Sequence, residues 1–372
     1  MECPPKPPKT TFGRKTLLMP LIGILAFFVY IYIFQVDLVA IFNKLQTVNP
    51  VIYSIAGLAS ILEIFFFSLS WRTLINFLKV KLSVLKANLL VWSGIFVDIL
   101  VPAESVSGEA LRVYLIAKEQ GNTSCGKVVA SLVTHRILGM TMNVSVLILG
   151  LSLIYTEGQI DSLVFNLVLF LTAAISTGLI LMILLSFKEK WSLKVIGWLV
   201  RVGKALSPKR WKEKIAAIGD EAINMAGSFH DSMIEFKKNP KALFISLGYL
   251  ILTWIFAVSI PYLVFVSLSP TGEPVAWSIL LITSGIVVAV KSIPIGIPFE
   301  VGLPEITMTT MFTSLGINWE LSATATILTR VITLWFRFFV SFIAQQILHL
   351  KPFLGNKESD NSGKLLPLTS TK

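Results

Sequence analysis

The residues Ile293-Pro294-Ile295-Gly296-Ile297-Pro298 interrupt an apolar segment that runs from 275 to 315. A shorter break, Val101-Pro102-Ala103, divides the apolar segment 87–118 in the same way. Proline has no amide hydrogen and its ring clashes with the preceding turn, so neither segment can form one regular helix. Each half is too short for a hydrocarbon core of about 30 Å, which takes about 20 helical residues to cross. We therefore predict two hairpins of half-helices that meet at membrane depth.

The rest of the chain has the composition of a membrane protein. It is 54% hydrophobic and only 14% charged, whereas a soluble domain carries about a quarter charged residues. Uninterrupted apolar segments long enough to span a bilayer lie at 16–36, 50–71, 128–155, 162–187, 241–268 and 322–349. The predicted fold class is an all-α polytopic membrane protein with about six full spans and two broken re-entrant helical hairpins in an inverted-topology repeat.

The positions of lysine and arginine predict the orientation. Basic residues gather in the N-terminal tail, in 72–86, in 188–214 and in the C-terminal tail, while the loops near 37–49, 156–161 and 269–274 hold only Lys44 among them. The positive-inside rule then places both termini in the cytoplasm, and the plasma membrane is the expected location. The first hairpin would enter from the cytoplasm and the second from outside. The net charge of +11 is accordingly assigned to contacts with a lipid surface, and no nucleic acid is expected.

The predicted organisation has five parts. They are a disordered basic tail at 1–15, a first membrane half at 16–187 with hairpin 87–118, cytoplasmic amphipathic helices at 188–240, a second membrane half at 241–350 with hairpin 275–315, and a disordered tail at 351–372. The stretch 188–240 has apolar residues at helical spacing on both sides of Ser207-Pro208. We interpret it as two helices that lie on the membrane surface.

The two hairpins resemble each other in sequence. The pairs that match in order are Ser93-Gly94-Ile95 with Ser284-Gly285-Ile286, Pro102 with Pro294, Glu109 with Glu305, Gly121 with Gly316, and Arg136 with Arg330. Three predicted spans separate the two units, and an odd number of spans inverts the second unit relative to the first. Inverted repeats with discontinuous helices are typical of secondary transporters. The alternative is a duplicated scaffold that has no transport role.

Charged or titratable residues lie within the apolar regions, among them Asp98, Glu104, Glu109, Arg112, His135, Arg136, Lys291, Glu300, Glu305, Arg330 and Arg337. Each costs about 2.5–3.5 kcal/mol at the centre of a lipid-facing helix, so each needs an interior partner or a wet cavity. The repeat predicts the pairs Glu109–Arg136 and Glu305–Arg330, and Glu63 could pair with either hairpin. These pairs are either structural or part of a charged vestibule for a lipid headgroup. His135 is expected to be a hydrogen-bonded interior residue.

The segment Val101–Arg112, with the residues that match it further along the chain, resembles the transmembrane region of lysylphosphatidylglycerol synthase. That family has Pro-Ala-Arg followed by Gly-Glu and an arginine, a Glu-Arg pair on the next span, and a Gly-hydrophobic-x-x-Glu segment in its second half. The resemblance covers most of residues 16–350, and the corresponding residues are Gly108, Glu109, Arg112, Gly302, Glu305 and Arg330. Glu104 stands where the family has arginine, His135 stands where it has glutamate, and residues 296–300 are looser than the glycine doublet of the family.

The resemblance implies a flippase-like protein that moves a lipid, or a lipid-linked group, between leaflets. The soluble aminoacyl-transfer domain of the family is not expected, because the chain ends at residue 372, shortly after its last predicted span. The predicted substrate-binding residues are Glu109, Arg112, Arg136, Glu305 and Arg330, and the predicted hinge residues are Pro102, Gly108, Pro294, Gly296, Pro298 and Gly302.

The expected partners are membrane lipids, with anionic headgroups favoured, and the sequence leaves open whether the protein is a homo-oligomer. The alternative function is a membrane-embedded enzyme, or an accessory subunit of one, in lipid or polyprenyl-glycan synthesis. For that alternative the only acid–base candidates are Asp98, Glu104 and Glu300, and their spacing has no metal-ligand pattern. Catalytic residues, metal ligands and a cofactor are not expected.

Overall fold

The computed structural model describes residues 46–101, 106–120, 125–157, 162–206, 209–268, 275–292 and 302–355. Within these ranges the regular structure is helical, and the helices are α3 (Pro50–Phe77), α4 (Val84–Leu100), α5 (Val106–Gln120), α6 (Cys125–Glu157), α7 (Ser162–Phe187), α8 (Glu189–Leu206), α9 (Lys209–Lys238), α10 (Lys241–Leu268), α11 (Trp277–Lys291), α12 (Leu303–Ser314), α13 (Trp319–Arg330), η3 (Val331–Phe336) and α14 (Arg337–Gly355). The predicted span 16–36 and the tail 1–15 lie outside the described residues. The last helix ends inside the segment 351–372 that was predicted as a tail.

Five helical segments of the described chain are long and apolar enough to cross a membrane. They are Pro50–Phe77, Cys125–Glu157, Val164–Phe187, Lys241–Leu268 and Trp319–Leu348. Each contains or closely matches one of the predicted spans, so five of the six predicted spans are found as helices of sufficient length. Long runs of apolar residues favour helices here because a helix satisfies its own backbone hydrogen bonds, which lipid cannot do.

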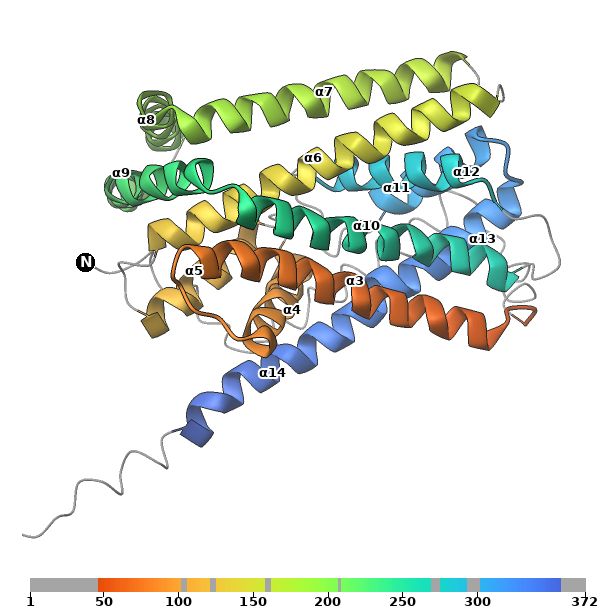
Figure 1. Cartoon of the computed structure of the whole chain (residues 1–372), viewed down its shortest axis with the longest axis horizontal. Coiled ribbons are helices and arrows are strands. Elements are labelled where there is room, and N and C mark those ends of the chain that lie inside the picture. Colours follow the sequence, from red (N-terminus) through yellow and green to blue (C-terminus); the bar gives the residue numbers. More distant parts are fainter. Residues whose placement is uncertain are drawn as a thin grey trace, which may run out of the picture.

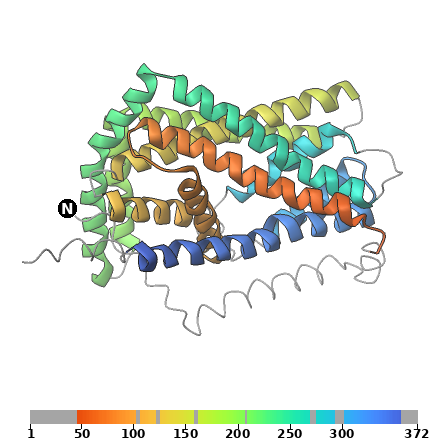
Figure 2. The same cartoon turned by 60° about the horizontal axis from the view of Figure 1, so that its bottom comes forward.

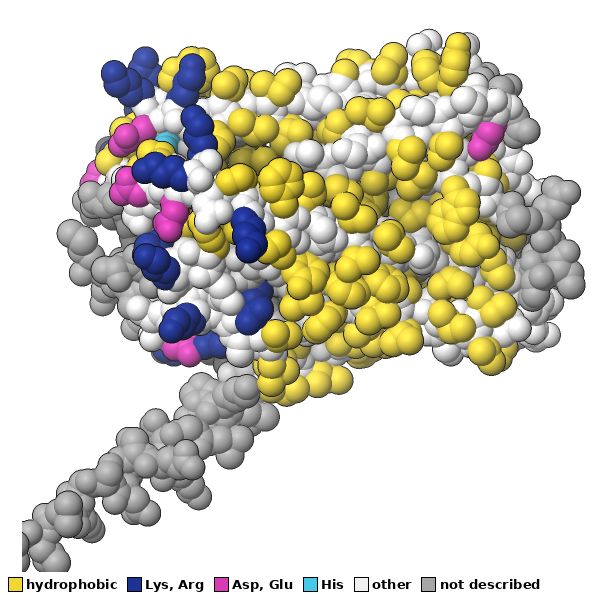
Figure 3. Space-filling model, in the orientation of Figure 1, with side chains coloured by type: hydrophobic (Ala, Val, Ile, Leu, Met, Phe, Trp, Pro, Cys, Tyr) yellow, Lys and Arg dark blue, Asp and Glu magenta, His cyan; other side chains and the backbone are white. Residues whose placement is uncertain are grey.

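The long helices run side by side, and α8 and α9 cross one end of the bundle (Figures 1 and 2). Lysine and arginine side chains gather at this end, whereas apolar side chains cover the length of the bundle (Figure 3). Figure 1 places the C-terminal ends of α3 and α7 and the start of α10 at the same basic end. We call it the basic end and the other one the opposite end. A wide apolar surface next to a basic end is typical of a protein that spans a bilayer.

The central contact of the bundle is between α3 and α10, which pack along most of their lengths. The contact holds small polar residues and aromatic rings. Ser70 Oγ and Ser246 Oγ are 2.7 Å apart in a buried hydrogen bond, and the rings of Phe66 and Phe256 stack at 5.6 Å. Small side chains let membrane helices approach closely, and a hydrogen bond between hydroxyls adds to the contact. At the opposite end, Asn49 caps α3 by accepting from the Val51 N–H at 3.0 Å.

The two predicted hairpins are found as two pairs of short helices, α4 with α5 and α11 with α12, and the members of each pair pack together. The longest of the four, α4, has 17 residues and the shortest, α12, has 12. At 1.5 Å per residue they measure about 18–26 Å, which is shorter than a hydrocarbon core of about 30 Å. The breaks fall between Val101 and Val106 and between Ser292 and Gly302. The proline breaks therefore divide both segments as predicted.

The two hairpins open at opposite ends of the bundle. At the open end of the first hairpin, an exposed ion pair joins Lys86 to Glu119. Gln120 Nε2 also donates a hydrogen bond of 3.0 Å to the Lys81 carbonyl there. These residues follow the C-terminal end of α3, at the basic end. The second hairpin opens at the C-terminal ends of α6 and α10, where Ser278 Oγ donates to Glu157 at 2.7 Å.

The last long helical segment contains a π-helical stretch. Residues Val331–Phe336 form η3, which continues from α13 and leads into α14. A π-helix bonds each N–H to the carbonyl five residues back, so its turns are wider than those of an α-helix. Arg330 lies immediately before this stretch and Arg337 immediately after it. Arg330 makes a buried ion pair and Arg337 a partly buried one, as described below.

The amphipathic helices α8 and α9 differ in how they contact the bundle. Met233 and Phe236 of α9 are buried in a cluster with Leu74 of α3 and with Leu78, which follows that helix, so α9 is packed on the protein. On α8 an apolar face stays exposed at Trp191, Val195 and Trp198. The sequence predicts a membrane-surface position for both helices. The structure adds for α9 a protein contact along the face that carries Met233 and Phe236.

Candidate functional site

The first hairpin is joined by a close contact between α4 and α5 at Gly94 and Gly108. A Cβ atom on Gly108 would lie 2.5 Å from the Gly94 carbonyl oxygen and 2.4 Å from Asp98 Oδ2. Asp98 of α4 accepts hydrogen bonds from the Gly108 N–H at 2.7 Å and from Ser107 Oγ at 2.6 Å. A carboxylate at the first turn of α5 also complements the helix dipole. The predicted hinge residue Gly108 therefore allows two backbones to touch beside the helix break.

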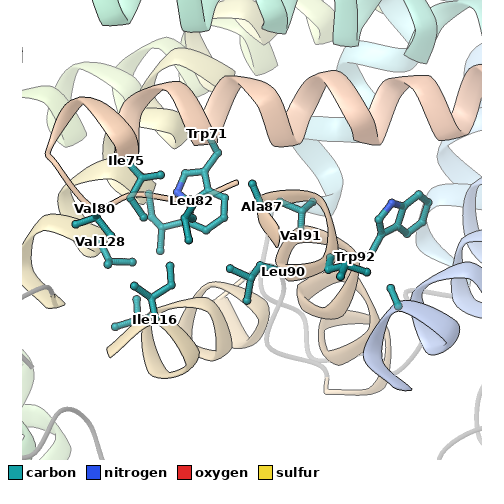
Figure 4. Packing of buried hydrophobic residues seen from close by; sticks show 14 of the residues in the cluster. Trp71, Ile75, Val80, Leu82, Ala87, Leu90, Val91, Trp92, Ile116 and Val128 are labelled. Carbon is teal, nitrogen blue, oxygen red and sulfur yellow. The ribbon is translucent and has the colours of Figure 1, made fainter. Parts of the chain in front are cut away.

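Arg112 lies one turn further along α5 and is buried, with 6% of its surface exposed. Its guanidinium carbon lies 5.1 Å from the ring centroid of Trp71 on α3, and Nε is 3.4 Å from the Gly108 carbonyl oxygen. A cation over an indole ring gains from the quadrupole of the ring. Trp71 belongs to the apolar cluster that fills the space between α3, α4 and α5 (Figure 4). Within the described residues, Arg112 Nη1 has no hydrogen-bond partner.

His135 of α6 lies beside Arg112 and is also buried, with 5% of its surface exposed. Its ring meets Phe67 edge to face at 4.5 Å, and Phe67 precedes Trp71 by one turn of α3. Its Nε2 atom has no partner in the described part of the chain. The interior position was predicted, but the expected hydrogen bond is not found at this nitrogen. Buried polar atoms without partners are uncommon in native proteins, and each calls for an explanation.

The predicted pair Glu109–Arg136 is confirmed. Arg136 Nη1 of α6 lies 3.5 Å from Glu109 Oε1 of α5, and the two side chains are 30% and 26% exposed. The distance is at the limit of a hydrogen bond, and the pair is open to its surroundings. Arg112 also interacts electrostatically with Glu109, Asp98 and Arg136. The first hairpin thus gathers two cations and two carboxylates on three helices.

The second predicted pair, Glu305–Arg330, is also confirmed, but its surroundings are different. Arg330 Nε lies 2.6 Å from Glu305 Oε1, and the side chains are only 6% and 2% exposed. The other carboxylate oxygen accepts the Gly302 N–H at 2.7 Å. Gly302 has φ of +101°, a conformation that favours glycine. Both oxygens of Glu305 are therefore used in closing the first turn of α12 on α13.

The structure therefore divides the five predicted binding residues into two groups. Glu109, Arg112 and Arg136 lie together around the start of α5, with buried and half-exposed polar atoms. Glu305 and Arg330 form a buried ion pair between α12 and α13. The sequence repeat predicted the partners in both halves, but it gave no sign of this difference in exposure.

Glu63 pairs with Arg337, and this corrects the expectation that it would pair with one of the hairpins. The two side chains are each 14% exposed, and Arg337 Nε also donates to Ser60 Oγ at 2.8 Å. This pair joins α3 to the helix that follows η3. Sequence reasoning also missed the contact of Trp71 with Arg112. The sequence signal that could have indicated this contact is Trp71 itself, a large aromatic residue close to the small residues Ser68 and Ser70 of α3.

Four predicted hinge residues, Pro102, Pro294, Gly296 and Pro298, lie outside the described residues, as do Glu104 and Glu300. In the described ranges, no group of three or more His, Cys, Asp or Glu side chains could hold a metal ion. The groups that come together in the first hairpin are hydrogen-bond donors of arginine and histidine, next to carboxylates. Such a set suits the binding of a charged headgroup.

The comparisons with known proteins agree with this architecture. A family model described as the lysylphosphatidylglycerol synthase TM region matches residues 20–341. The chain is also 26% identical over 276 residues to the UPF0104 membrane protein PH1989 of Pyrococcus horikoshii, which covers 74% of this chain and 80% of that relative. No solved structure matches the chain significantly. The range matched by the family model contains both hairpins and both ion pairs. The chain is thus a member of the lysylphosphatidylglycerol synthase transmembrane-region family.

Proposed function

We propose that this protein moves a lipid, or a lipid-linked group, between the two leaflets of a membrane. The observation that carries the proposal is the partly exposed Glu109–Arg136 pair beside the buried Arg112, at the break of a hairpin too short to cross the bilayer. Charged groups in a membrane-spanning protein face its interior or a wet cavity and mark substrate pathways. Helix breaks at membrane depth are found where they line such a cavity.

In this proposal the two hairpins are re-entrant and form an inverted repeat. Their opening at opposite ends of the bundle supports it, since it is the arrangement that inversion produces. The basic end faces the cytoplasm, as the clustering of lysine and arginine there supports (Figure 3). Both termini are then cytoplasmic, and the protein is placed in the cell membrane. The headgroup passes along the polar groups of the first hairpin while the acyl chains stay in the apolar band.

Reconstitution tests the proposal directly. The full-length protein is placed in vesicles that contain fluorescent lipids, and a membrane-impermeant quencher measures how fast label leaves the inner leaflet. The panel includes zwitterionic, anionic and polyprenyl lipids. We expect faster exchange for at least one lipid class than in empty vesicles, and loss of this gain in Glu109→Ala.

The matched control is Glu119→Ala, which removes a carboxylate from the exposed pair at the far end of the same helix. It should keep the wild-type rate. If wild-type protein exchanges no lipid class faster than empty vesicles do, lipid translocation is the wrong function. If Glu119→Ala loses activity as fully as Glu109→Ala, the first hairpin site is not the path.

A further inference from the structure

We infer that Arg112, His135 and Arg136 form a phosphate-binding site, and that Glu109 occupies it when no ligand is present. The ligand class is a phosphoryl group, carried by a lipid headgroup or present as free phosphate. The inference rests on the proposed function, because it names the part of the lipid that the first hairpin binds. It assigns no such role to the second hairpin.

The first argument is the state of Arg112. A guanidinium presents five N–H donors, and here Nη1 is unpartnered within the described residues while only 6% of the surface of the residue is exposed. The ring of Trp71 covers one face of the group at 5.1 Å and holds it in place without using a donor. Leaving a buried charged donor without an acceptor is unfavourable. A phosphate oxygen is the acceptor that a guanidinium fork fits best.

The second argument is that His135, which lies beside Arg112, has another nitrogen that is unpartnered within the described residues. Its ring packs on Phe67, one turn before Trp71 on α3, so Arg112 and His135 lie over neighbouring turns of one helix. Arg112 also acts on His135 electrostatically. When the proton of the imidazole is on Nε2, this atom donates to an oxygen that Arg112 also binds. Two buried donors from two helices then converge on one acceptor group.

The third argument concerns Glu109. Its carboxylate lies 3.5 Å from Arg136 Nη1, which is long for a charge-assisted hydrogen bond of about 2.7–2.9 Å. The pair is about 70–75% buried by side-chain exposure. A carboxylate held loosely against an arginine is easily displaced by a phosphate, which offers more acceptor oxygens. Glu109 thus acts as an internal anion that keeps Arg136 satisfied between binding events.

The fourth argument comes from the second half of the repeat. When Glu109 is matched with Glu305, the residue that matches Arg112 is Met308, and when Arg136 is matched with Arg330, the residue that matches His135 is Thr329. The second half keeps the glutamate and the arginine but has neither of the additional donors Arg112 and His135. Its carboxylate is bound on both oxygens. Thr329 offers only a hydroxyl, which is also unpartnered in the described residues, so the nitrogen donors of an arginine and a histidine come together with the glutamate–arginine pair only in the first half of the described chain.

The binding test uses the purified full-length protein in detergent and native mass spectrometry, which counts and identifies bound molecules by mass. The probes are short-chain phosphatidic acid, phosphatidylglycerol, diacylglycerol and inorganic phosphate. We expect one phosphate-bearing lipid per chain and no comparable binding of diacylglycerol, which has the same tails without phosphate. Displacement of the lipid by inorganic phosphate at similar concentration would assign the site to free phosphate instead of a headgroup.

Two variants test the residues. Arg112→Gln should weaken binding by about tenfold or more, since a hydrogen bond to a charged group contributes about 1.5–3 kcal/mol. Its control is Lys118→Gln, which removes a cation from the exposed last turn of the same helix. His135→Gln retains a donor and should weaken binding less than His135→Phe.

For Glu109→Gln we expect the opposite effect, tighter phosphate binding, which a partly unfolded protein would not produce. The substitution frees Arg136 and should tighten phosphate binding by up to about fivefold, the equivalent of a partly exposed ion pair. Glu119→Gln, which frees Lys86 in the same way, should change nothing. Weaker binding in Glu109→Gln would overturn the inference, because Glu109 would then hold a cationic part of the ligand.

Failure of this inference is distinguishable from failure of the proposed function. If lipids exchange between leaflets but phosphate-bearing lipids bind no better than diacylglycerol, translocation stands and the phosphate site is wrong. If phosphate-bearing lipids bind through Arg112 but no lipid exchanges, the site stands and translocation is wrong.

Discussion

Arg330 donates to Glu305 across 2.6 Å, and the two side chains are almost completely enclosed. The matching residues of the first hairpin, Glu109 and Arg136, are 3.5 Å apart and partly exposed. The two halves of the repeat thus keep the same pair of residue types in different environments. A buried pair is destabilising to break from one side, because the remaining charge stays in a medium of low polarity.

Glu305→Gln is therefore expected to lower the free energy of unfolding by about 3–5 kcal/mol, the cost of leaving a buried charge without its partner. Thermal and denaturant unfolding in detergent measure the effect. Glu320→Gln removes an exposed carboxylate from the first turn of the adjoining helix α13 and serves as the control. Equal stability of the two variants would show that the Glu305–Arg330 pair does not hold α12 in place.

Gly108→Ala is expected to destabilise the protein by about 1–3 kcal/mol, as for overpacking in a tight contact. The new methyl group would overlap Asp98 Oδ2 and the Gly94 carbonyl oxygen and push α5 away from α4. Gly248→Ala on α10 is the matched control, because a Cβ there meets nothing within 4 Å. It should alter stability by no more than about 1 kcal/mol, in the direction of a stronger helix former. A similar loss in both variants would contradict the close contact.

A double-mutant cycle on Glu63 and Arg337 should give a coupling free energy of about 0.5–3 kcal/mol, the range for residues in one polar network. The single variants are Glu63→Gln and Arg337→Gln, and unfolding in detergent is again the measurement. Ser60→Ala, which removes the other acceptor of Arg337, reports how much of the effect belongs to the hydroxyl. Additive effects of the two single variants would mean that the pair contributes nothing beyond its members.

Orientation in the membrane is testable by labelling of introduced cysteines. Lys204→Cys lies at the basic end, and Glu157→Cys lies at the opposite end, where α6 finishes. In intact cells, a membrane-impermeant maleimide should label Glu157→Cys, whereas Lys204→Cys should react after the cells are opened. The parent chain, which contains Cys3 and Cys125, is the labelling blank. The reverse pattern would invert the proposed topology.

Much of this architecture follows from local properties of the chain. Apolar length predicted the spans, because lipid permits only helices there, and Pro102 and Pro294 predicted two breaks that fall within the interruptions of the helices. The ion-pair partners followed from the repeat, since matching positions in duplicated units have matching neighbours. Arg136 and Arg330 were paired correctly on this basis.

Other features depend on packing between segments distant in the sequence, which no local pattern reveals. The partner of Glu63 is Arg337, and their separation is set by how α3 and the last helix pack. The exposure of Glu109 relative to Glu305 depends on how α5 and α12 sit against their neighbours, although both glutamates occupy the first turn of a half-helix. The sequence likewise does not predict the contact of α9 with α3, because an amphipathic face fits a lipid surface and a protein surface equally well.

The π-helical stretch between Arg330 and Arg337 decides which way these two side chains face. In a regular α-helix, residues seven apart differ by only about 20° in direction, so both arginines would project toward the same side. The wider turns of η3 take more residues for each revolution and rotate Arg337 toward Glu63 while Arg330 meets Glu305. Removing one residue from this stretch would favour a regular helix in which the two arginines, then six positions apart, still point in directions about 120° apart, so we expect such a deletion to keep both partnerships. The stretch thus sets the angular register of the final span. Rotation of α14 relative to α13 about the helix axis would break either the Glu305–Arg330 pair or the Glu63–Arg337 pair.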